Sequence, residues 1–178
     1  AFDAPVNYRA IPLSQDHHEQ VSQTIGLMRD WANEDSFSAP IQRDGRLMDS
    51  GQDDLCADAF WWTKNKVKFQ QDEDTAAPFR NFFDDEVIEV LIRPRDLANM
   101  TAPVEDCDGF SSYTAALLRS RGIKCNAVTI AADARDPHRF SHVYLACYPN
   151  GKRVALDTSH GPYPGWEAPN LFGLKKEW

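Results

Sequence analysis

The residues of this sequence that could do chemistry together are a cysteine, a histidine and an aspartate in the second half of the chain. Cys107 stands at the expected start of a helix, where the helix dipole and backbone N–H groups favour a thiolate. His142 and Asp157 lie in two expected strands further along. A thiolate nucleophile, an imidazole that holds the proton and a carboxylate that orients the imidazole are the groups that acyl transfer requires. The types and order of these residues therefore predict a Cys–His–Asp triad.

The relative placement of the histidine and the aspartate follows from the turn between their strands. Asn150-Gly151 is the strongest short-range signal for a two-residue β-hairpin turn. The register set by such a turn places Tyr144 opposite Asp157 and makes His142 a diagonal neighbour of Asp157 on the same face. Diagonal neighbours are about 7–8 Å apart between Cα atoms, which is within side-chain reach. A bulge in either strand would destroy this arrangement.

The nucleophile is expected at the start of the most regular helix of the chain, over residues 107–121. Asp106 is a suitable N-cap for this helix, and Gly122 is the residue expected just past its end. Three strands are expected after it, over residues 123–131, 141–148 and 152–158. The predicted triad is thus carried by a helix and by the antiparallel sheet that follows it.

The first half of the chain and the two ends are expected to frame this core. Helical spacing of apolar residues predicts helices over residues 20–33 and 53–66, with a polar loop over 33–54 between them. Residues 67–69 end the second helix or form a short strand. The other expectations are an exposed acidic stretch at 70–85, a short helix at 86–92 stopped by Pro94, an irregular arm at 1–19 and a wrapping tail at 159–178.

Three stretches of the sequence resemble the core of the transglutaminase-like superfamily. Residues 105–123 read Glu-Asp-Cys-Asp-Gly-Phe-Ser-Ser-Tyr-Thr-Ala-Ala-Leu-Leu-Arg-Ser-Arg-Gly-Ile, similar to the family's cysteine helix with its Leu-Leu-Arg-x-x-Gly-Ile ending. Phe-Ser-His-Val-Tyr-Leu at 140–145 is similar to the histidine strand, and Val-Ala-Leu-Asp-Thr at 154–158 to the aspartate strand. The spacings, 35 residues from cysteine to histidine and 15 from histidine to aspartate, agree as well. The resemblance is strong over 105–158 and weaker back to about residue 20.

The resemblance implies a single α+β domain over residues 1–178 with a papain-like, transglutaminase-like core, in which the helix bearing Cys107 packs on an antiparallel sheet. It also implies a thiol hydrolase (peptidase or amidase) or an acyltransferase, working through a Cys107 thioester with His142 and Asp157 on a peptide or protein amide. A peptidase is favoured over a protein crosslinker, because the compact form resembles bacterial and phage-borne relatives. No cofactor and no metal are expected, since Asp72-Glu73-Asp74 lacks the spacing of a calcium loop.

Several assignments around the triad stay open. Trp166, Tyr144 and Asp108 are candidates for the substrate cleft, although Trp166 could equally hold the tail in place. The second donor to an oxyanion could be Trp62, Gln70 or Gln71. His138 and His160 compete with His142 as the base, but both lie in loops flanked by proline or glycine.

The remaining candidates are interpreted as structural residues without a part in chemistry. Cys56, Cys125 and Cys147 are expected to be small buried packing residues, because the four cysteines show neither metal spacing nor the density of a disulfide scaffold. His17-His18 is expected as a solvated pair, and Trp31, Trp61 and Trp62 as core. The two carboxylates beside Cys107 disfavour its thiolate. A non-catalytic module that keeps the fold, for example one associated with a phage, is therefore the alternative function.

Composition limits the partners. The 178 residues carry 19 basic and 27 acidic side chains, a net charge of −8, and show no basic patch of the kind that nucleic-acid binders use. No run reaches the roughly 18 apolar residues of a membrane span, and residues 1–5 lack the features of a signal peptide. We therefore expect a soluble protein, cytoplasmic or phage-associated rather than secreted, of unspecified oligomeric state.

Overall fold

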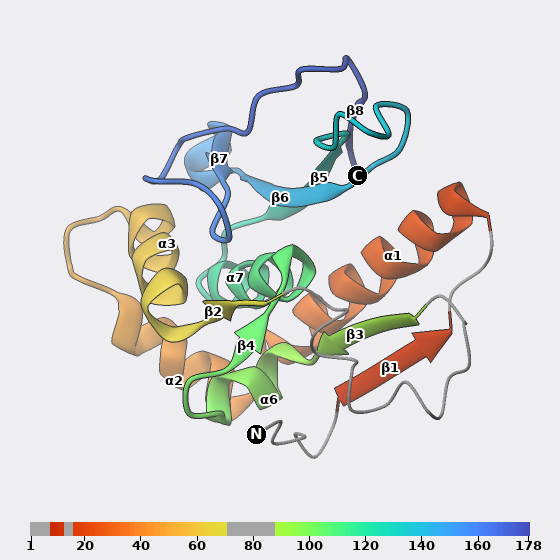
Figure 1. Cartoon of the computed structure of the whole chain (residues 1–178). Helices are drawn as coiled ribbons and strands as arrows, with labels where there is room; N and C mark the ends of the chain where they lie inside the picture. Colours follow the sequence, from red (N-terminus) through yellow and green to blue (C-terminus); the bar gives the residue numbers. More distant parts are fainter. Residues whose placement is uncertain (1–7, 13–15, 71–87) are drawn as a thin grey trace.

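The computed structural model describes residues 8–12, 16–70 and 88–178, and it has a mixed architecture of helices and β-sheet. The helices pack around one antiparallel sheet, and short strand pairs lie outside it (Figure 1). The elements of the first half are β1 (Tyr8–Pro12), α1 (His17–Asp35), α2 (Ala39–Met48), α3 (Leu55–Lys66), β2 (Lys68–Phe69), β3 (Ile88–Ile92), α6 (Pro94–Asn99) and β4 (Val104–Glu105). The second half contains α7 (Cys107–Ser120), β5 (Cys125–Ile130), β6 (His142–Cys147), β7 (Val154–Leu156) and β8 (Lys175–Glu177).

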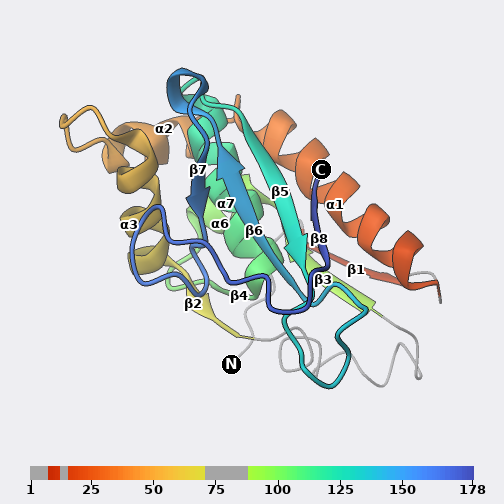
Figure 2. The same ribbon diagram turned by 90° about the horizontal axis from the view of Figure 1, so that it is seen from above.

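The main sheet has four antiparallel strands in the order β7–β6–β5–β8. Helix α7 packs against one face of it, with α1 and α3 on either side of α7 (Figure 2). The chain that follows β7 crosses the other face before it returns as β8 at the edge of the sheet (Figure 1). The sheet therefore has an inner face toward α7 and an outer face covered by the C-terminal segment.

The two faces of the sheet carry separate apolar clusters. On the inner face, Leu145 and Leu156 pack with the buried residues of α7 and α3 in the largest cluster. On the outer face, Tyr144 and Ala146 pack with Ala168 of the C-terminal segment. Because side chains alternate along a strand, His142 shares the outer face with Tyr144.

The hairpin between β6 and β7 forms in the predicted register. Leu145 pairs with Leu156 and Ala146 with Ala155, the pairs that a two-residue turn at Asn150-Gly151 requires. Asn150 has φ 52° and Gly151 has φ 79°, the positive values that a type I′ turn needs at both central positions. The prediction that His142 and Asp157 meet on one face rested on this register, and the register is confirmed.

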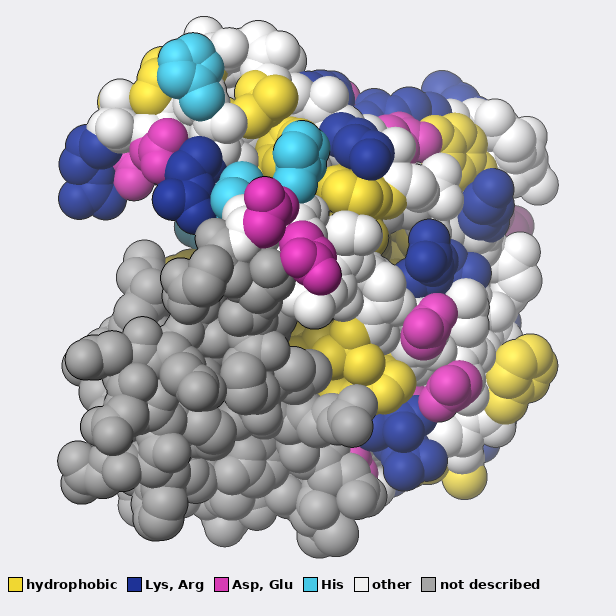
Figure 3. Space-filling view, turned by 90° about the vertical axis from the view of Figure 1, so that its right-hand side faces the viewer, with side chains coloured by type: hydrophobic (Ala, Val, Ile, Leu, Met, Phe, Trp, Pro, Cys, Tyr) yellow, Lys and Arg dark blue, Asp and Glu magenta, His cyan; other side chains and the backbone are white. Residues whose placement is uncertain are grey.

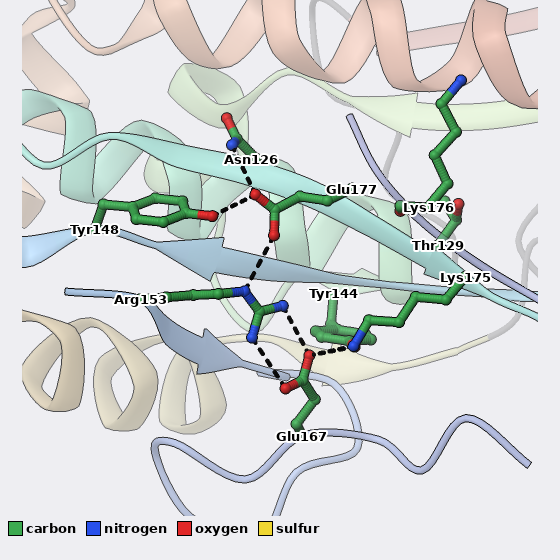
Figure 4. Close-up of polar contacts among 9 residues, drawn as sticks. All are labelled: Asn126, Thr129, Tyr144, Tyr148, Arg153, Glu167, Lys175, Lys176 and Glu177. Atoms are coloured by element: carbon green, nitrogen blue, oxygen red, sulfur yellow. Dashed lines mark hydrogen bonds and ion pairs between the residues drawn. The ribbon is translucent and has the colours of Figure 1, made fainter. Parts of the chain in front are cut away.

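A polar network ties the C-terminal segment to the outer face of the sheet (Figure 4). The Arg153 guanidinium donates to Glu167 at 2.8 and 3.0 Å and to Glu177 at 3.1 Å. Lys175 also donates to Glu167, at 2.9 Å, and the Tyr148 hydroxyl donates to Glu177. Arg153 thereby links the loop after β7 to β8.

Three segments differ from the sequence predictions. The expected loop at 33–54 contains α2, whose Gly45 packs so closely on α7 that a Cβ there would lie 2.6 Å from Ser120 Oγ. The expected helix at 86–92 contains the strand β3, and a helix begins at Pro94 instead of ending before it, because proline fits the first turn of a helix. The expected irregular arm contains β1 and the start of α1, while the tail includes β8. The stretch at 70–85, which is expected to be acidic and exposed, lies outside the described residues except for Gln70.

Two of the three cysteines expected to be packing residues have a different role. Cys125 and Cys147 form a disulfide across directly paired positions of β5 and β6, with Cα atoms 4.1 Å apart, instead of serving as separate packing residues. The sequence signal for this bond is only the register of β5 and β6, which sets whether two cysteines 22 residues apart come to lie opposite each other. Cys56 is a buried free cysteine, as expected.

Two further expectations concern exposure. Trp31 is buried as predicted, whereas Trp61 is 47% exposed and does not belong to the core. Within the described part of the chain, no helix is both long enough and apolar enough to cross a membrane.

Candidate active site

Cys107 is the first residue of α7, and the surrounding sequence explains why the helix begins there. The Asp106 carboxylate caps the helix by accepting the Asp108 N–H at 3.1 Å. The carboxyl group of Glu105, which is 2% exposed, lies over the first turn and accepts the Ile92 N–H at 2.8 Å. Gly109 makes room for it, since a Cβ at that position would lie 2.2 Å from Glu105 Cδ. The cysteine is therefore held at the helix N-terminus by the Asp106 cap and by the contacts of the buried Glu105 carboxyl group.

The Cys107 side chain is partly exposed and lines a cavity of about 220 Å³ together with His142. Helix α1 forms one wall of this cavity and residues 140–143 form another; the remaining lining includes Asp106, Asp108 and Thr129. Cys107 Sγ lies 4.0 Å from Asp108 Oδ1. The thiol and the imidazole thus border one space, beside Asp106 and Asp108. Acidic side chains and histidines also lie next to one another on the face of the molecule drawn in Figure 3.

His142 and Asp157 form a close pair on the outer face of the sheet. His142 Nε2 lies 2.6 Å from Asp157 Oδ2, and the Asp157 side chain is completely buried. Asp157 Oδ1 accepts the His160 backbone N–H at 3.0 Å and the Ser159 hydroxyl at 3.2 Å. Burial opposes the charge on Asp157, but the hydrogen bond and charge of His142, with the His160 N–H, outweigh it and hold the pKa below its usual value. The carboxylate is ionised at neutral pH and engages Nε2, which leaves Nδ1 for proton exchange.

His160 lies beside His142, although its position in a loop makes it the weaker candidate for the base from sequence alone. Its ring is edge-on to the His142 ring, with centroids 4.9 Å apart, and edge-on to Phe69 at 4.8 Å. Burial, and next the charge of His142, lower the pKa of His160, with Lys64 acting in the same direction and Asp157 against it. The His160 ring therefore packs against His142 in surroundings that disfavour its protonated form. The hairpin register could not place His160, because β7 ends at Leu156 and residues 158–160 form a turn; the sequence signal was only its short separation from Asp157 along the chain.

The three cleft candidates are placed differently. Asp108 lines the cavity beside Cys107. Tyr144 is completely buried, its hydroxyl donates to Glu167 at 2.7 Å and its ring stacks on His142 with centroids 5.9 Å apart, so its assignment to a substrate cleft is corrected to a support beneath the histidine. Trp166 packs against the outer-face cluster that contains Tyr144. It therefore holds the tail on the sheet, one of the two roles that the sequence allowed.

The remaining polar candidates have partners that limit their roles. Trp62 Nε1 donates to Tyr113 Oη at 2.8 Å, so it is not available as the oxyanion donor in this arrangement. Gln70 N–H donates to Glu105 O at 2.8 Å, two residues before Cys107, whereas Gln71 lies outside the described residues. His17 is not merely solvated, because its Nε2 accepts the Phe140 N–H at 3.1 Å.

Two groups of side chains in the described residues have a donor set that could hold a metal ion. His142, Asp157 and His160 form one group, and Asp106, Cys107 and Asp108 form the other, each with its ligand atoms within 4.8 Å of one another. Both groups coincide with the triad residues and their neighbours. Within the first group, the 2.6 Å hydrogen bond between His142 and Asp157 occupies atoms that a metal would need.

Comparisons with known proteins give limited information. No protein-family model matches the sequence, and no curated protein matches it. Among solved structures, the fold is similar to that of a protein from Cytophaga hutchinsonii described provisionally as a cysteine protease, with a TM-score of 0.42 and 17% identity. The match covers 85% of this chain and 49% of that chain, so this chain spans about half of its length. A similarity of this strength establishes neither a family nor an activity.

Proposed function

We propose that this protein is a thiol hydrolase that cleaves peptide or amide bonds, with Cys107 as nucleophile, His142 as general base and acid, and Asp157 as the group that orients His142. The observation that carries the proposal is the 2.6 Å hydrogen bond between a buried carboxylate and a histidine that lines the same cavity as a cysteine at a helix N-terminus. We also propose that the helix and the sheet that carry these residues form a papain-like, transglutaminase-like core.

The reaction follows from the properties of the three groups. The proton of Cys107 passes to His142 Nδ1, and the thiolate attacks the carbonyl carbon of the scissile amide. The imidazolium then protonates the departing amine, and the C–N bond breaks to leave a thioester on Cys107. A water molecule gives its proton to His142 and cleaves the thioester, which releases the acid. An amine in place of water would make the same protein an acyltransferase.

The charged groups around the cavity act in opposite directions on the ionisation of the Cys107 thiol. The negative carboxylates of Asp106 and Asp108 beside Cys107 favour the protonated thiol. The N-terminus of α7 favours the thiolate, and the Asp106 carboxylate is engaged in capping that helix. In the proposed thiolate–imidazolium pair, His142 carries the proton taken from Cys107, and the positive charge of its ring lies between the thiolate and the Asp157 carboxylate.

The test compares the two cysteines of the molecule that lie outside the disulfide, Cys107 and Cys56. In the native protein, iodoacetamide is expected to label Cys107 at a rate that titrates below the ordinary cysteine pKa of about 8.5. Cys56 is the internal control, because burial, with the charge of Asp54, raises the pKa of its thiol to about 11. Equal and slow labelling of both thiols would favour the non-catalytic module.

Activity is tested with Cys107→Ser and Cys107→Ala against libraries of peptides, amides and esters. Both variants are expected to lose all turnover that the wild type shows, while Cys56→Ser retains it. Undiminished turnover in Cys107→Ala would show that the nucleophile is a different residue. Product analysis in the presence of a primary amine separates hydrolysis from transfer.

A further inference from the structure

His17, the first residue of α1, joins two segments that form walls of the cavity containing Cys107. Its Nε2 accepts the Phe140 N–H at 3.1 Å. One turn further along α1, Gln20 and Val21 line this cavity, and Phe140 lines it from the segment that leads into β6. The contact between His17 and Phe140 therefore fastens one wall of the cavity to another.

Both nitrogens of the His17 ring face hydrogen-bond donors. Nε2 faces the Phe140 N–H, and Nδ1 lies 3.1 Å from Arg139 Nη2, which can only donate. A neutral imidazole has one nitrogen without a proton, so it can accept from one of these two neighbours. An imidazolium has an N–H on both nitrogens, so it can accept from neither and would also face the positive charge of Arg139. The contact with Phe140 therefore requires the neutral ring.

The surroundings of His17 keep the ring neutral at neutral pH and leave it within reach of solvent protons. The side chain is partly exposed and borders a second cavity, of about 440 Å³. Burial, and next the charge of Arg139, lower the pKa of His17 below its ordinary value of 6.5. His18 acts in the same direction, whereas Asp136 and Asp16 act against it. The titratable and charged groups around the ring are thus Asp16, His18, Asp136, His138 and Arg139.

The chain directly after Phe140 is anchored to β5. The Ser141 N–H donates to Ile130 O at 2.9 Å, and Ser141 Oγ accepts the Ala132 N–H at 2.8 Å. Loss of the contact with His17 would therefore allow Phe140 and the residues before it to move, while Ser141 and β6 stay in place.

We propose that His17 is a pH-dependent clasp between two walls of the proposed active-site cavity: the neutral ring holds Phe140 beside α1, and the protonated ring releases it. Acidification then widens the cavity at Phe140. Because the pKa of His17 is lowered in the folded state, the stabilising contribution of the clasp is complete above about pH 6.5 and is lost as pH falls through the folded value. The regulation of substrate access rests on the function proposed above, whereas the clasp itself does not.

The first experiment is an NMR titration of the full chain from neutral to mildly acidic pH. The Phe140 amide resonance is expected to shift with the same midpoint as the His17 ring, below about 6.5. In His17→Gln the amide should not follow this titration, because a glutamine carbonyl oxygen can accept the Phe140 N–H but does not ionise. His18→Gln is the matched control, since this exposed neighbour lines the second cavity, and it should retain the shift. A Phe140 amide that does not titrate in the wild type, or that titrates equally in His17→Gln, would refute the clasp.

The second experiment measures whether the clasp controls access to the cavity. Cys107 is labelled separately by a bulky and by a small thiol reagent, and the ratio of the two rates cancels the fraction of thiolate. From neutral to acidic pH, the ratio of bulky to small should rise about fivefold in the wild type, as expected for the loss of one hydrogen bond, and stay constant in His17→Gln. A ratio independent of pH in the wild type would refute control of the cavity by His17. Absence of turnover on every substrate would instead refute the proposed function and leave the clasp standing, because neither measurement depends on catalysis.

Discussion

Replacing Asp157 by asparagine tests the geometry of the proposed triad most sharply. Asp157 is fully buried and its carboxylate accepts hydrogen bonds from His142, Ser159 and the His160 N–H. Asparagine has nearly the same shape, and its carbonyl oxygen can keep the two contacts of Oδ1. Its amide nitrogen then faces His142 Nε2 as a donor, so the imidazole must carry its proton on Nδ1. The atom that should accept the thiol proton is no longer free to do so.

Two magnitudes follow for Asp157→Asn. Locking the base in the wrong tautomer lowers kcat by about 10⁴-fold in triads of this kind. Loss of a hydrogen bond to a charged group lowers the free energy of unfolding by about 1.5–3 kcal/mol. Because the pKa of Asp157 is lowered in the folded state, its stabilising contribution is complete above the ordinary aspartate pKa of about 4 and is lost as pH falls through the folded value.

The assay combines kcat/KM on a substrate cleaved by the wild type with urea unfolding at neutral and acidic pH. The stability difference between wild type and Asp157→Asn should shrink as the solution is acidified. Asp133→Asn is the matched control, because Asp133 pairs with Arg135 at the surface and lies in neither cavity. Activity of Asp157→Asn within tenfold of the wild type would refute the role of this carboxylate. A stability difference that grows toward acidic pH would refute the linkage.

Three further predictions concern the framework of the site. Gly109→Ala should lower the free energy of unfolding by about 1–3 kcal/mol in urea titrations, because the new Cβ would overlap buried Glu105. Arg153→Gln should raise hydrogen exchange over residues 163–178 while α7 amides stay protected, since this side chain links the loop after β7 to β8; unchanged exchange would contradict that role. Mass spectrometry of the non-reduced, denatured protein should find Cys125 and Cys147 joined in one peptide pair, and free thiols at both positions would contradict the assignment.

Much of the site could be predicted because its signals are local. The Asp106 cap, the helix that starts at Cys107 and the positive-φ turn at Asn150-Gly151 depend on a few consecutive residues. The turn fixes the register of β6 and β7, and the register alone brings His142 and Asp157 to one face. The contact between His142 and Asp157 could therefore be predicted without knowledge of the rest of the fold.

Other features depend on contacts between distant segments and left no local pattern. The helix α2 was missed because its polar residues and Gly45 indicate a loop, while its stability comes from close packing on α7. The strand β3 was mistaken for a helix because a short apolar run has no decisive period. The disulfide needs the alignment of β5 with β6, which no turn of two residues specifies.

The residue types and their spacing along the chain were enough to select the three candidate catalytic residues and the hairpin that pairs two of them. The burial of Tyr144 beneath His142, the packing of His160 on His142 and the place of α1 in the wall of the cavity beside Cys107 could be seen only in the folded structure. Caps and turns depend on a few consecutive residues and can be predicted from them, whereas burial and cavity walls depend on contacts between segments that are far apart in the chain.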